Sequence, residues 1–277
     1  MSNLDRFSLK NKVVVITGAA GFFAKQQINA VFKGNGNLVL IDIDKRKIDL
    51  LSKKLRKKFK NRKILCLCGD ICDEKFVKNC LKEIKKFFRK IDVLINNAAI
   101  DYKPMRKIFS SSKLRLENFD FKNWDKDINV GLKGATICSK VFGGDMTKKR
   151  SGVILNIASD LALISPDNRL YEKKGVKQNN QAVKPVTYSV VKHGIIGLTK
   201  YISTYWAKYN LRCNAIAPGG IENNQDKPFK EKISKLIPLG RLSKKNEYEE
   251  AILFLISDAS SYMTGSTLVI DGGRTVW

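Results

Sequence analysis

The stretch VVVITGAAGFFAKQ, residues 13–26, decides the expected fold. Its apolar opening, VVVIT, predicts a buried strand, and the glycine-containing segment that follows predicts a tight turn into a helix. Such a turn suits a dinucleotide, because the backbone can approach the pyrophosphate and the free N–H groups of a helix N-terminus face the anion. Gly18 and Gly21 supply the turn and the approach, and Ala24 stands at the packing position, where alanine is tolerated. A glycine pair alone is a weak signal, since many strand-to-helix turns contain glycine.

Apolar strand-like runs alternate with helical patterns along the rest of the chain. The further strands expected are NLVLID, KILCLC, IDVLINNAA, GVILNIAS, LRCNAIAPG and STLVIDGG, and helices are expected near 22–33, from Lys45 onward and over Glu74–Phe88. Strands separated by helices form βαβ units. The sequence therefore predicts an α/β fold in which residues 1–277 form one domain. We expect a Rossmann-like, doubly wound parallel sheet of about seven strands with helices on both faces.

Two polar stretches, 101–118 and 160–185, interrupt this alternation. Loops that leave the carboxyl ends of parallel strands line the ligand crevice of such a sheet. We therefore predict that both are substrate-side loops. The alternative is that each is a surface excursion without functional meaning.

The chain carries 52 lysines and arginines against 26 acidic residues, a formal net charge of +26. Such an excess can indicate a nucleic-acid partner. In the segment DKRKIDLLSKKLRKKFKNRK, however, lysines fall between apolar residues at helical spacing, and no aromatic residues interleave as stacking platforms. A solvated helix face is the better interpretation, and a nucleic-acid partner is not expected.

The cysteines and the chain's apolar runs indicate the compartment. No CxxC pair occurs among the six cysteines, so reduced thiols in a cytoplasmic protein are expected. A single histidine, His193, excludes a multi-histidine metal site, and no metal is predicted. The first residues, MSNLDRFSLK, contain no apolar signal segment, and the longest apolar runs are too short for a bilayer, so no membrane association is expected.

Asp42, at the end of NLVLID, indicates which nucleotide is bound. A carboxylate there accepts hydrogen bonds from the ribose 2′-hydroxyl of NAD and repels the 2′-phosphate of NADP. Asp42 could instead cap a helix that begins near Lys45. Lys45 and Arg46 are close enough in sequence to meet a 2′-phosphate. NAD(H) is thus the preferred cofactor, with NADP(H) left open.

YSVVK, residues 188–192, places a phenol and an ammonium one helical turn apart. A free tyrosine, with a reference pKa of about 10, is a poor acid or base near neutral pH, but a nearby cation favours its phenolate. The pair therefore suits proton transfer to an alcohol or carbonyl oxygen. An ordinary helix with a packed Tyr188 and a solvated Lys192 is the alternative. Ser159 ends GVILNIAS at the same sheet edge, and Asn129 lies where it could kink a helix and position water.

With these residues assembled, the chain resembles the short-chain dehydrogenase/reductase family over nearly its whole length. The matching elements are TGAAG at 17–21, Asp42, GDI at 69–71, NNAA at 96–99, Asn129, Ser159, Tyr188, Lys192, APGGI at 217–221 and IDGG at 270–273. The resemblance implies that Tyr188 is the general acid/base and that Ser159 orients the carbonyl. It also implies that Lys192 lowers the tyrosine's pKa and holds the nicotinamide ribose, and that Asn129 supports a water-linked proton relay.

The same resemblance implies the cofactor contacts. They comprise Gly18, Gly21, Phe23, Asp42, Asp70, Ile71, Asn97, Ala98, Tyr188, Lys192, Pro218, Gly219 and Ile221. Two departures bear on them. Phe22 and Ala24 do not fit a TGxxxGxG loop, whereas a TGxxGxxG loop leaves only Ala24 out of pattern. Asn223 stands where a threonine often contacts the carboxamide, and its amide could substitute for that threonine.

The C-terminal half is most similar to dehydrogenases of flagellin and surface-glycan modification, in pathways to legionaminic-type nonulosonic acids. This similarity implies a phosphorylated or nucleotide-linked sugar substrate. Four cations of the long loop could pair with its phosphates, or could simply belong to the general excess of lysine: Arg169, Lys173, Lys174 and Lys177. A homo-oligomer, dimer or tetramer, is also implied, formed through the helix of Tyr188 and the C-terminal region. The alternatives are a 3-oxoacyl-(acyl-carrier-protein) reductase and a non-catalytic basic scaffold protein.

Overall fold

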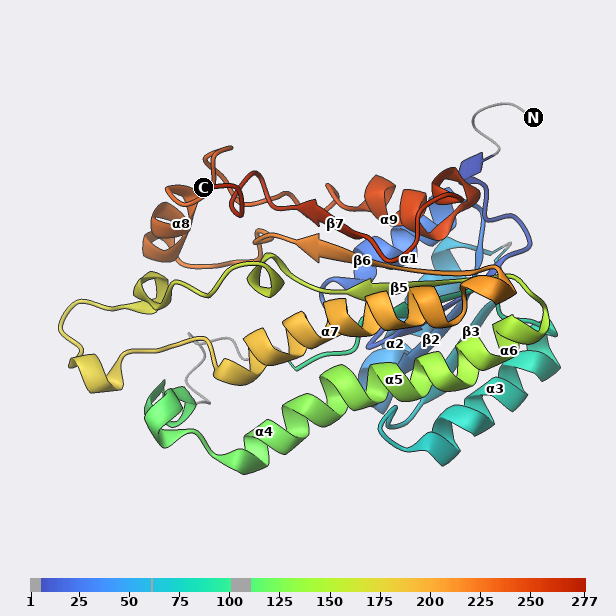
Figure 1. Ribbon diagram of the computed structural model, residues 1–277, viewed down its shortest axis with the longest axis horizontal. Coiled ribbons are helices and arrows are strands. Elements are labelled where there is room, and N and C mark those ends of the chain that lie inside the picture. The colour runs from blue at the N-terminus through green and yellow to red at the C-terminus, as the bar shows by residue number, and fades with distance from the viewer. Residues whose placement is uncertain (1–5, 61, 101–110) are drawn as a thin grey trace.

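One parallel sheet of seven strands, in the order β3-β2-β1-β4-β5-β6-β7, forms the centre of the computed structural model, which describes residues 6–60, 62–100 and 111–277 (Figure 1). The strands are β1 Val13–Thr17, β2 Asn37–Asp42, β3 Ile64–Cys68, β4 Val93–Asn96, β5 Gly152–Ile157, β6 Leu211–Pro218 and β7 Thr267–Ile270. The chain proceeds from β1 toward β3 on one side and then from β4 toward β7 on the other. The predicted Rossmann-like, doubly wound sheet is confirmed, with its topological switch point between β1 and β4.

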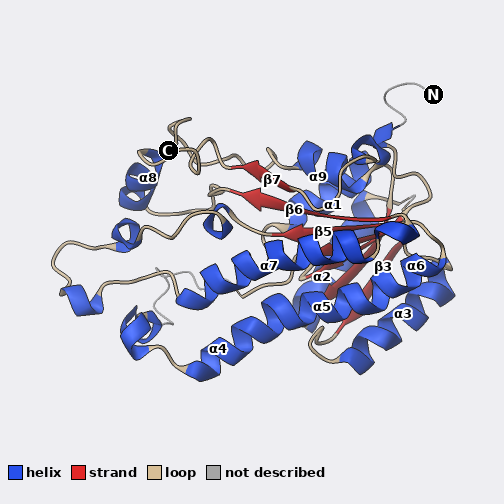
Figure 2. Cartoon of the chain, in the orientation of Figure 1, coloured by secondary structure: helices blue, strands red, loops and turns tan. Residues whose placement is uncertain are grey.

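Helices cover both faces of the sheet (Figure 2). Their bounds are α1 Ala24–Lys33, α2 Lys45–Lys58, α3 Glu74–Phe88, α4 Phe121–Ile128, α5 Ala135–Cys138, α6 Gly144–Lys148, α7 Val186–Tyr205, α8 Lys227–Ser234 and α9 Glu249–Ile256. Two π-helical stretches, Asn129–Gly134 and Ser139–Gly143, connect α4, α5 and α6 into one long helical rod. This rod, α3 and α7 lie on the near side of the sheet in Figure 1, and α1 and α2 lie behind it.

The alternation of side chains along β1 divides the apolar core in two. Val14 and Ile16 pack toward α1, α2 and α9, whereas Val13 and Val15 pack toward α3, α5 and α7. A central strand buried on both faces explains why this segment is a continuous apolar run rather than an alternating one. The six cysteines, all within the described residues, are free thiols.

Sequence and structure agree closely on the elements, with one correction. The expected helix over Glu74–Phe88 has these bounds in the structure. The alternative in which Asp42 caps α2 is wrong, because Asp44 is the capping residue and accepts a hydrogen bond from Lys47 N. A cap must lie directly before the first helical turn, and Asp42 still belongs to β2.

The carboxyl ends of β5, β6 and β7 point toward α8 and the long segment 160–185 (Figure 2). This segment contains only three short 3₁₀ turns, 160–162, 168–171 and 178–180. Of the other predicted loop, residues 101–110 lie outside the described residues. The remainder touches the long segment, since the Arg115 guanidinium donates to the Gln178 carbonyl at 3.1 Å.

Candidate active site

The turn after β1 is locked against the end of β4. Gly18 has φ +62, and a Cβ at this position would lie 2.8 Å from the Ala98 Cα. Asn97 and Ala98 donate their backbone N–H groups to Thr17 Oγ1 at 3.1 and 3.2 Å. The Asn97 amide in turn donates to the carbonyls of Thr17 and Gly18 at 2.9 and 3.0 Å. Only glycine fits such a close approach at positive φ, which explains on steric grounds why residue 18 is glycine.

The N-terminus of α1 opens beside this turn. Within the described residues, no side chain caps it, and its first turn contains Lys25 and no acidic residue. A helix end of this kind leaves N–H groups directed at the turn, which suits a pyrophosphate. Phe23, expected among the cofactor contacts, packs its ring edge-on against Tyr248, with centroids 5.5 Å apart. Its side chain is therefore part of the packing between the starts of α1 and α9.

The Asp42 carboxylate lies at the carboxyl end of β2 and is held from two sides. It accepts hydrogen bonds from Ala20 N and Asp44 N, each at 2.9 Å. These bonds join the turn after β1 to the turn after β2 and fix the carboxylate at the sheet edge. Lys45, a candidate for a 2′-phosphate, pairs with Asp49 at 2.9 Å.

Asp70 and Ile71 follow β3 and differ in their exposure. Asp70 is exposed and accepts a hydrogen bond from Cys72 N at 2.8 Å. Ile71 is buried and packs onto Gly134 of the long helical rod, where a Cβ would come within 2.7 Å of Ile71 Cδ1. The pair thus offers one polar and one apolar surface next to Asp42 at the same sheet edge.

Tyr188, Ser159 and Lys192 come together as the sequence predicted. The Tyr188 hydroxyl lies 3.4 Å from Ser159 Oγ, and the Lys192 Nζ is 5.9 Å from the centre of the tyrosine ring. Ser159 lies two residues after the end of β5, and α7 supplies the side chains of Tyr188 and Lys192, which are one helical turn apart. Lys192 is buried and donates to the Ile157 carbonyl at 2.7 Å, which holds its ammonium at the sheet edge. The arrangement can move a proton to or from an oxygen placed against Tyr188 and Ser159.

Asn129 and the segment after β6 complete the predicted set. Asn129 is the first residue of the π-helical stretch that interrupts the rod, so the helix changes its hydrogen bonding at this residue. Pro218 ends β6, and Gly219 N donates to the Ile270 carbonyl at 2.9 Å. Ile221 forms an isolated bridge with Ser243. Asn223 N donates to Gln225 Oε1 at 2.7 Å, which orders the turn that follows.

Comparison with known proteins agrees with this geometry. A family model described as enoyl-(acyl carrier protein) reductase matches residues 23–275. The NAD-dependent glycerol dehydrogenase of Listeria innocua is 31% identical over 275 residues, which cover 98% of this chain and 96% of that protein. The chain belongs to the short-chain dehydrogenase/reductase family. It is therefore an oxidoreductase that uses a nicotinamide cofactor to interconvert an alcohol and a ketone.

Other short-chain dehydrogenase/reductases are similar over equal lengths. The 3-oxoacyl-(acyl-carrier-protein) reductase FabG of Thermotoga maritima is 32% identical over 272 residues, with 97% of this chain and 99% of that protein covered. Post-translational flagellin modification protein A of Campylobacter coli is 27% identical over 265 residues, with 96% and 98% covered. A gluconate 5-dehydrogenase structure from Burkholderia cenocepacia, in complex with NADP and tartrate, has a TM-score of 0.84 at 24% identity, with 99% of each chain covered, a likeness of fold.

These relatives confirm the predicted family and leave the glycan-modification subgroup a prediction. The site residues fit a nicotinamide dinucleotide, because the turn at Gly18 is sterically closed to larger residues and the adjoining helix end is free of acidic side chains. No helix in the described part of the chain is long and apolar enough to cross a bilayer.

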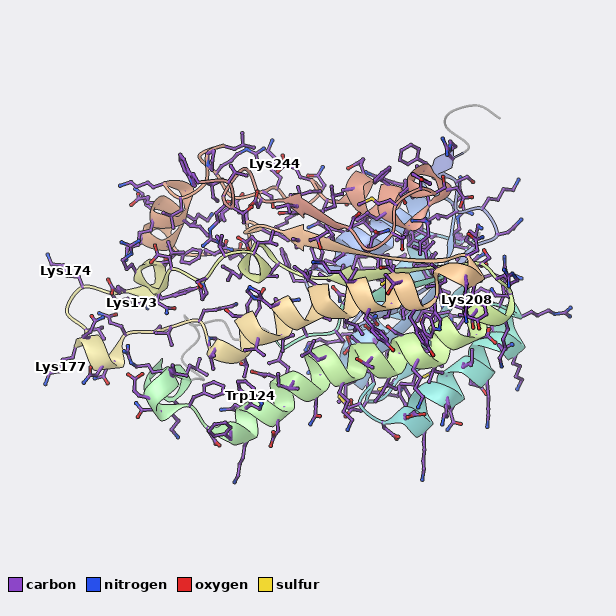
Figure 3. All side chains as sticks on the ribbon, in the orientation of Figure 1. Trp124, Lys173, Lys174, Lys177, Lys208 and Lys244 are labelled. Carbon is purple, nitrogen blue, oxygen red and sulfur yellow. The ribbon has the colours of Figure 1, made fainter. Side chains whose placement is uncertain are left out.

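The structure also shows which loop cations lie near the reacting groups. Lys173, Lys174 and Lys177 lie on the outer part of the long loop, beyond the first turn of α7 (Figure 3). Arg169 pairs with Asp167 at 2.8 Å. The cation that does meet the site is Lys184, whose Nζ lies 3.8 Å from the centre of the Tyr188 ring. Lys184 was missed because no local pattern distinguishes it from the many other lysines of the chain.

A second group that sequence reasoning missed lies behind Ser159. Its hydroxyl donates to Asp160 Oδ1 at 2.8 Å, and Asp160 Oδ2 accepts from the Arg274 guanidinium at 2.7 Å. Arg274 directly follows the IDGG element, 114 residues after Asp160, so no local spacing relates the two. Its position after that element was the only signal available.

Proposed function

We propose that this short-chain dehydrogenase/reductase uses NAD(H) to interconvert an alcohol and a ketone on an anionic sugar derivative. The sugar would be phosphorylated or nucleotide-linked, and the reaction would belong to surface-glycan or flagellin modification. The observation that carries the chemistry is the 3.4 Å approach of the Tyr188 hydroxyl to Ser159 Oγ, with the Lys192 ammonium beside the ring. A cytoplasmic homo-oligomer, dimer or tetramer, is part of the same proposal, on the basis of the family resemblance.

In this mechanism Tyr188 exchanges the proton and Ser159 orients the substrate oxygen. In the oxidation direction, the tyrosine phenolate takes the proton of the substrate hydroxyl. In the reduction direction, the phenol returns a proton to the oxygen of the former carbonyl. The bound nicotinamide supplies the hydride acceptor or donor. Lys192 stabilises the phenolate by its charge, and Asn129 begins the π-helical stretch from which a water-linked proton relay would start.

The preference for NAD(H) rests on Asp42. Its carboxylate is fixed by the N–H groups of Ala20 and Asp44, so it cannot turn away from a ribose placed at the end of β2. A fixed negative charge there favours a 2′-hydroxyl over a 2′-phosphate. The ion pair of Lys45 with Asp49 removes part of the positive charge that would favour NADP(H).

The proposal that the substrate is an anionic sugar rests on the position of Lys184 and on the names of the relatives. The Lys184 ammonium is half-buried against the ring of Tyr188, where it can meet a phosphate or carboxylate of a substrate whose hydroxyl faces the phenol. The glycerol dehydrogenase acts on a polyol by its name, which supports a polyhydroxy substrate. The name of the flagellin modification protein supports a role in flagellin modification.

A 3-oxoacyl-(acyl-carrier-protein) reductase is the second candidate. FabG of Thermotoga maritima is similar over the whole chain, and a net charge of +26 would suit an acidic carrier protein. This candidate requires turnover of a 3-oxoacyl thioester and, in the usual case, a preference for NADPH.

The decisive experiment is a fluorescence titration of the protein with NADH and NADPH, followed by steady-state assays. We expect tight NADH binding and weak NADPH binding, and then turnover of hexose phosphates or nucleotide sugars. Turnover of a 3-oxoacyl thioester together with inactivity toward every sugar would instead establish the second candidate.

Asp42→Asn sharpens the titration. It keeps one oxygen for a backbone N–H and removes the charge, so the ratio of NADH to NADPH affinity should fall about tenfold, equivalent to about 1.4 kcal/mol. Asp120→Asn is the matched control, because its carboxylate also accepts a backbone N–H, from Lys122, at the start of α4. An unchanged ratio in Asp42→Asn would contradict the role of this carboxylate.

A further inference from the structure

The C-terminal turn directs one arginine inward. Asp271, directly after β7, accepts hydrogen bonds from Gly273 N at 2.9 Å and Thr275 N at 2.8 Å. Gly272 and Gly273 have φ of +70 and +89, conformations that favour glycine. Arg274 follows this glycine pair and its side chain is buried.

The Arg274 guanidinium forms a buried ion pair with Asp160. Their atoms lie 2.7 Å apart, and the two side chains are 7% and 4% exposed. Removing two charges from water is costly, and a buried pair is on average weak as a source of stability. A role other than stability therefore has to be considered for this pair.

Asp160 connects the pair to Ser159. One carboxylate oxygen faces Arg274, and the other accepts both the Ser159 hydroxyl proton and Leu161 N, each at 2.8 Å. A serine hydroxyl has a single proton. Because that proton is directed at Asp160, Ser159 Oγ faces the Tyr188 hydroxyl as an acceptor.

We propose that Asp160 and Arg274 are positioning residues that set the hydroxyl direction of Ser159 and the charge felt by Tyr188. Arg274 neutralises the carboxylate, so Ser159 can share its proton with a substrate oxygen. An uncompensated Asp160 would hold that proton and oppose formation of the Tyr188 phenolate. This inference rests on the roles of Ser159 and Tyr188 in the proposed function.

Charged side chains from several elements act on this phenol. They are Lys192 on its own helix, Lys184 in the segment before it, Asp127 on α4, which accepts a hydrogen bond from Thr187 Oγ1, and the pair of Asp160 and Arg274. The lysines favour the phenolate and the aspartates oppose it. Removal of one member of the Asp160 and Arg274 pair should therefore move the ionisation of Tyr188 in a direction set by the charge removed.

The test is a pH titration of tyrosinate absorbance, in which each variant is compared with the same variant carrying Tyr188→Phe. In Arg274→Gln, we expect the midpoint assigned to Tyr188 to rise by about one pH unit, and in Asp160→Asn to fall by about one. The double variant should return within about 0.3 of the native midpoint, because its charge again balances. Arg212→Gln is the control, since Arg212 is also partly buried but donates to Ser257 and Met263 carbonyls. It should leave the midpoint unchanged.

Enzyme assays give the second readout. With any alcohol that the native enzyme oxidises, Arg274→Gln should lower kcat about tenfold near pH 7 and move the pH profile upward, while NADH affinity stays within about twofold. Equal midpoints in the native protein and both folded single variants, or an equal change in Arg212→Gln, would overturn the proposal. If neither single variant folds, the double variant decides. It keeps the charge balance but lacks the carboxylate that directs the Ser159 hydroxyl, so its kcat reports on positioning alone. A kcat below about one third of native at unchanged nucleotide KM supports positioning, and native kcat contradicts it.

The titration requires no substrate, so failure of the sugar hypothesis leaves it interpretable. Full activity in Tyr188→Phe would overturn the proposed mechanism instead, whatever the titration of Arg274→Gln shows.

Discussion

The two edges of the site are held in different ways. On the cofactor side, the turn after β1 packs so closely on the end of β4 that a Cβ at Gly18 would lie 2.8 Å from the Ala98 Cα. The side-chain amide of Asn97 reinforces this contact, since it donates to the Thr17 and Gly18 carbonyls and accepts from Gln27 Nε2 at 2.6 Å. On the substrate side, the segment 160–185 is held mainly by side chains. Gln181, for example, bonds to the backbone of Lys173 and Val176.

The substrate side also has its own small apolar cluster, apart from the two sheet cores. Its buried members are Leu170, Ile233, Ile237 and Leu242, and Tyr171 stacks on Phe229 with ring centres 5.7 Å apart. Lys232 of α8 donates to the Arg169 and Glu172 carbonyls, which fastens α8 to the long loop. Close backbone packing at Gly18 makes the cofactor edge intolerant of added atoms, whereas no described atom lies within 4 Å of a Cβ added at Gly175 in the substrate-side segment.

The largest effect is expected where the two edges meet. Tyr188→Phe removes the proton donor and leaves the ring packing, so kcat should fall about 10²- to 10⁴-fold while NADH affinity changes less than about twofold. Steady-state assays and NADH fluorescence measure the two quantities. Substantial activity in this variant would refute the acid/base role.

The next effect tests the close backbone packing at Gly18 directly. Gly18→Ala adds a Cβ 2.8 Å from the Ala98 Cα at φ +62, and should cost about 3 kcal/mol and lower Tm by about 6 °C, with NADH binding weakened at least about tenfold. Gly175→Ala is the matched control on the substrate side. Gly175 has φ +81, but no described atom lies within 4 Å of its added Cβ, so only strain of about 1 kcal/mol is expected.

Equal losses of Tm in these two variants would show that strain alone governs both positions. The contrast between the two edges would then have no basis in close packing.

A smaller effect is expected for the substrate edge. Phe229→Ala removes the stack with Tyr171, which should loosen α8 from the long loop and raise substrate KM about three- to tenfold with NADH affinity unchanged. Phe87→Ala is the control, because Phe87 also pairs with an aromatic ring, Phe88, but lies half-exposed at the end of α3. A rise in NADH Kd equal to the rise in KM would mean that the two edges are not independent.

The smallest effect concerns pH. Arg241 and the Lys244 N–H lower the pKa of Glu247 to about 2. A carboxyl whose pKa is lowered by folding stabilises the fold above its ordinary pKa of 4.5, and this contribution is lost as pH falls from there toward 2. Glu247→Gln should therefore lower Tm by at most about 2 °C at pH 7, because the pair is partly exposed.

The difference in Tm between the native protein and Glu247→Gln should shrink as pH falls below about 4.5. Thermal unfolding at several pH values checks it, and a difference that grows on acidification would have the wrong sign.

Particular residues show how far sequence alone could go. The continuous apolar run of β1 and the helical spacing over 74–88 predicted elements whose bounds the structure reproduces, because burial pattern and local geometry specify them together. Tyr188 and Lys192 were recognised for the same reason, since one helical turn separates them. Asp44, rather than Asp42, caps α2, because one or two residues decide a helix boundary.

The sequence by itself determined the alternation of strands and helices, the glycine turn after β1 and the placement of Tyr188 and Lys192 one turn apart on a helix, since each depends on residues close together in the chain. Only the tertiary structure decided that Lys184 meets the Tyr188 ring while Lys173, Lys174 and Lys177 do not, and that Arg274 reaches Asp160. The physical reason is distance along the chain. Local spacing fixes which way a side chain leaves its own element, whereas contacts between remote segments depend on strand order and on how loops pack across the sheet edge.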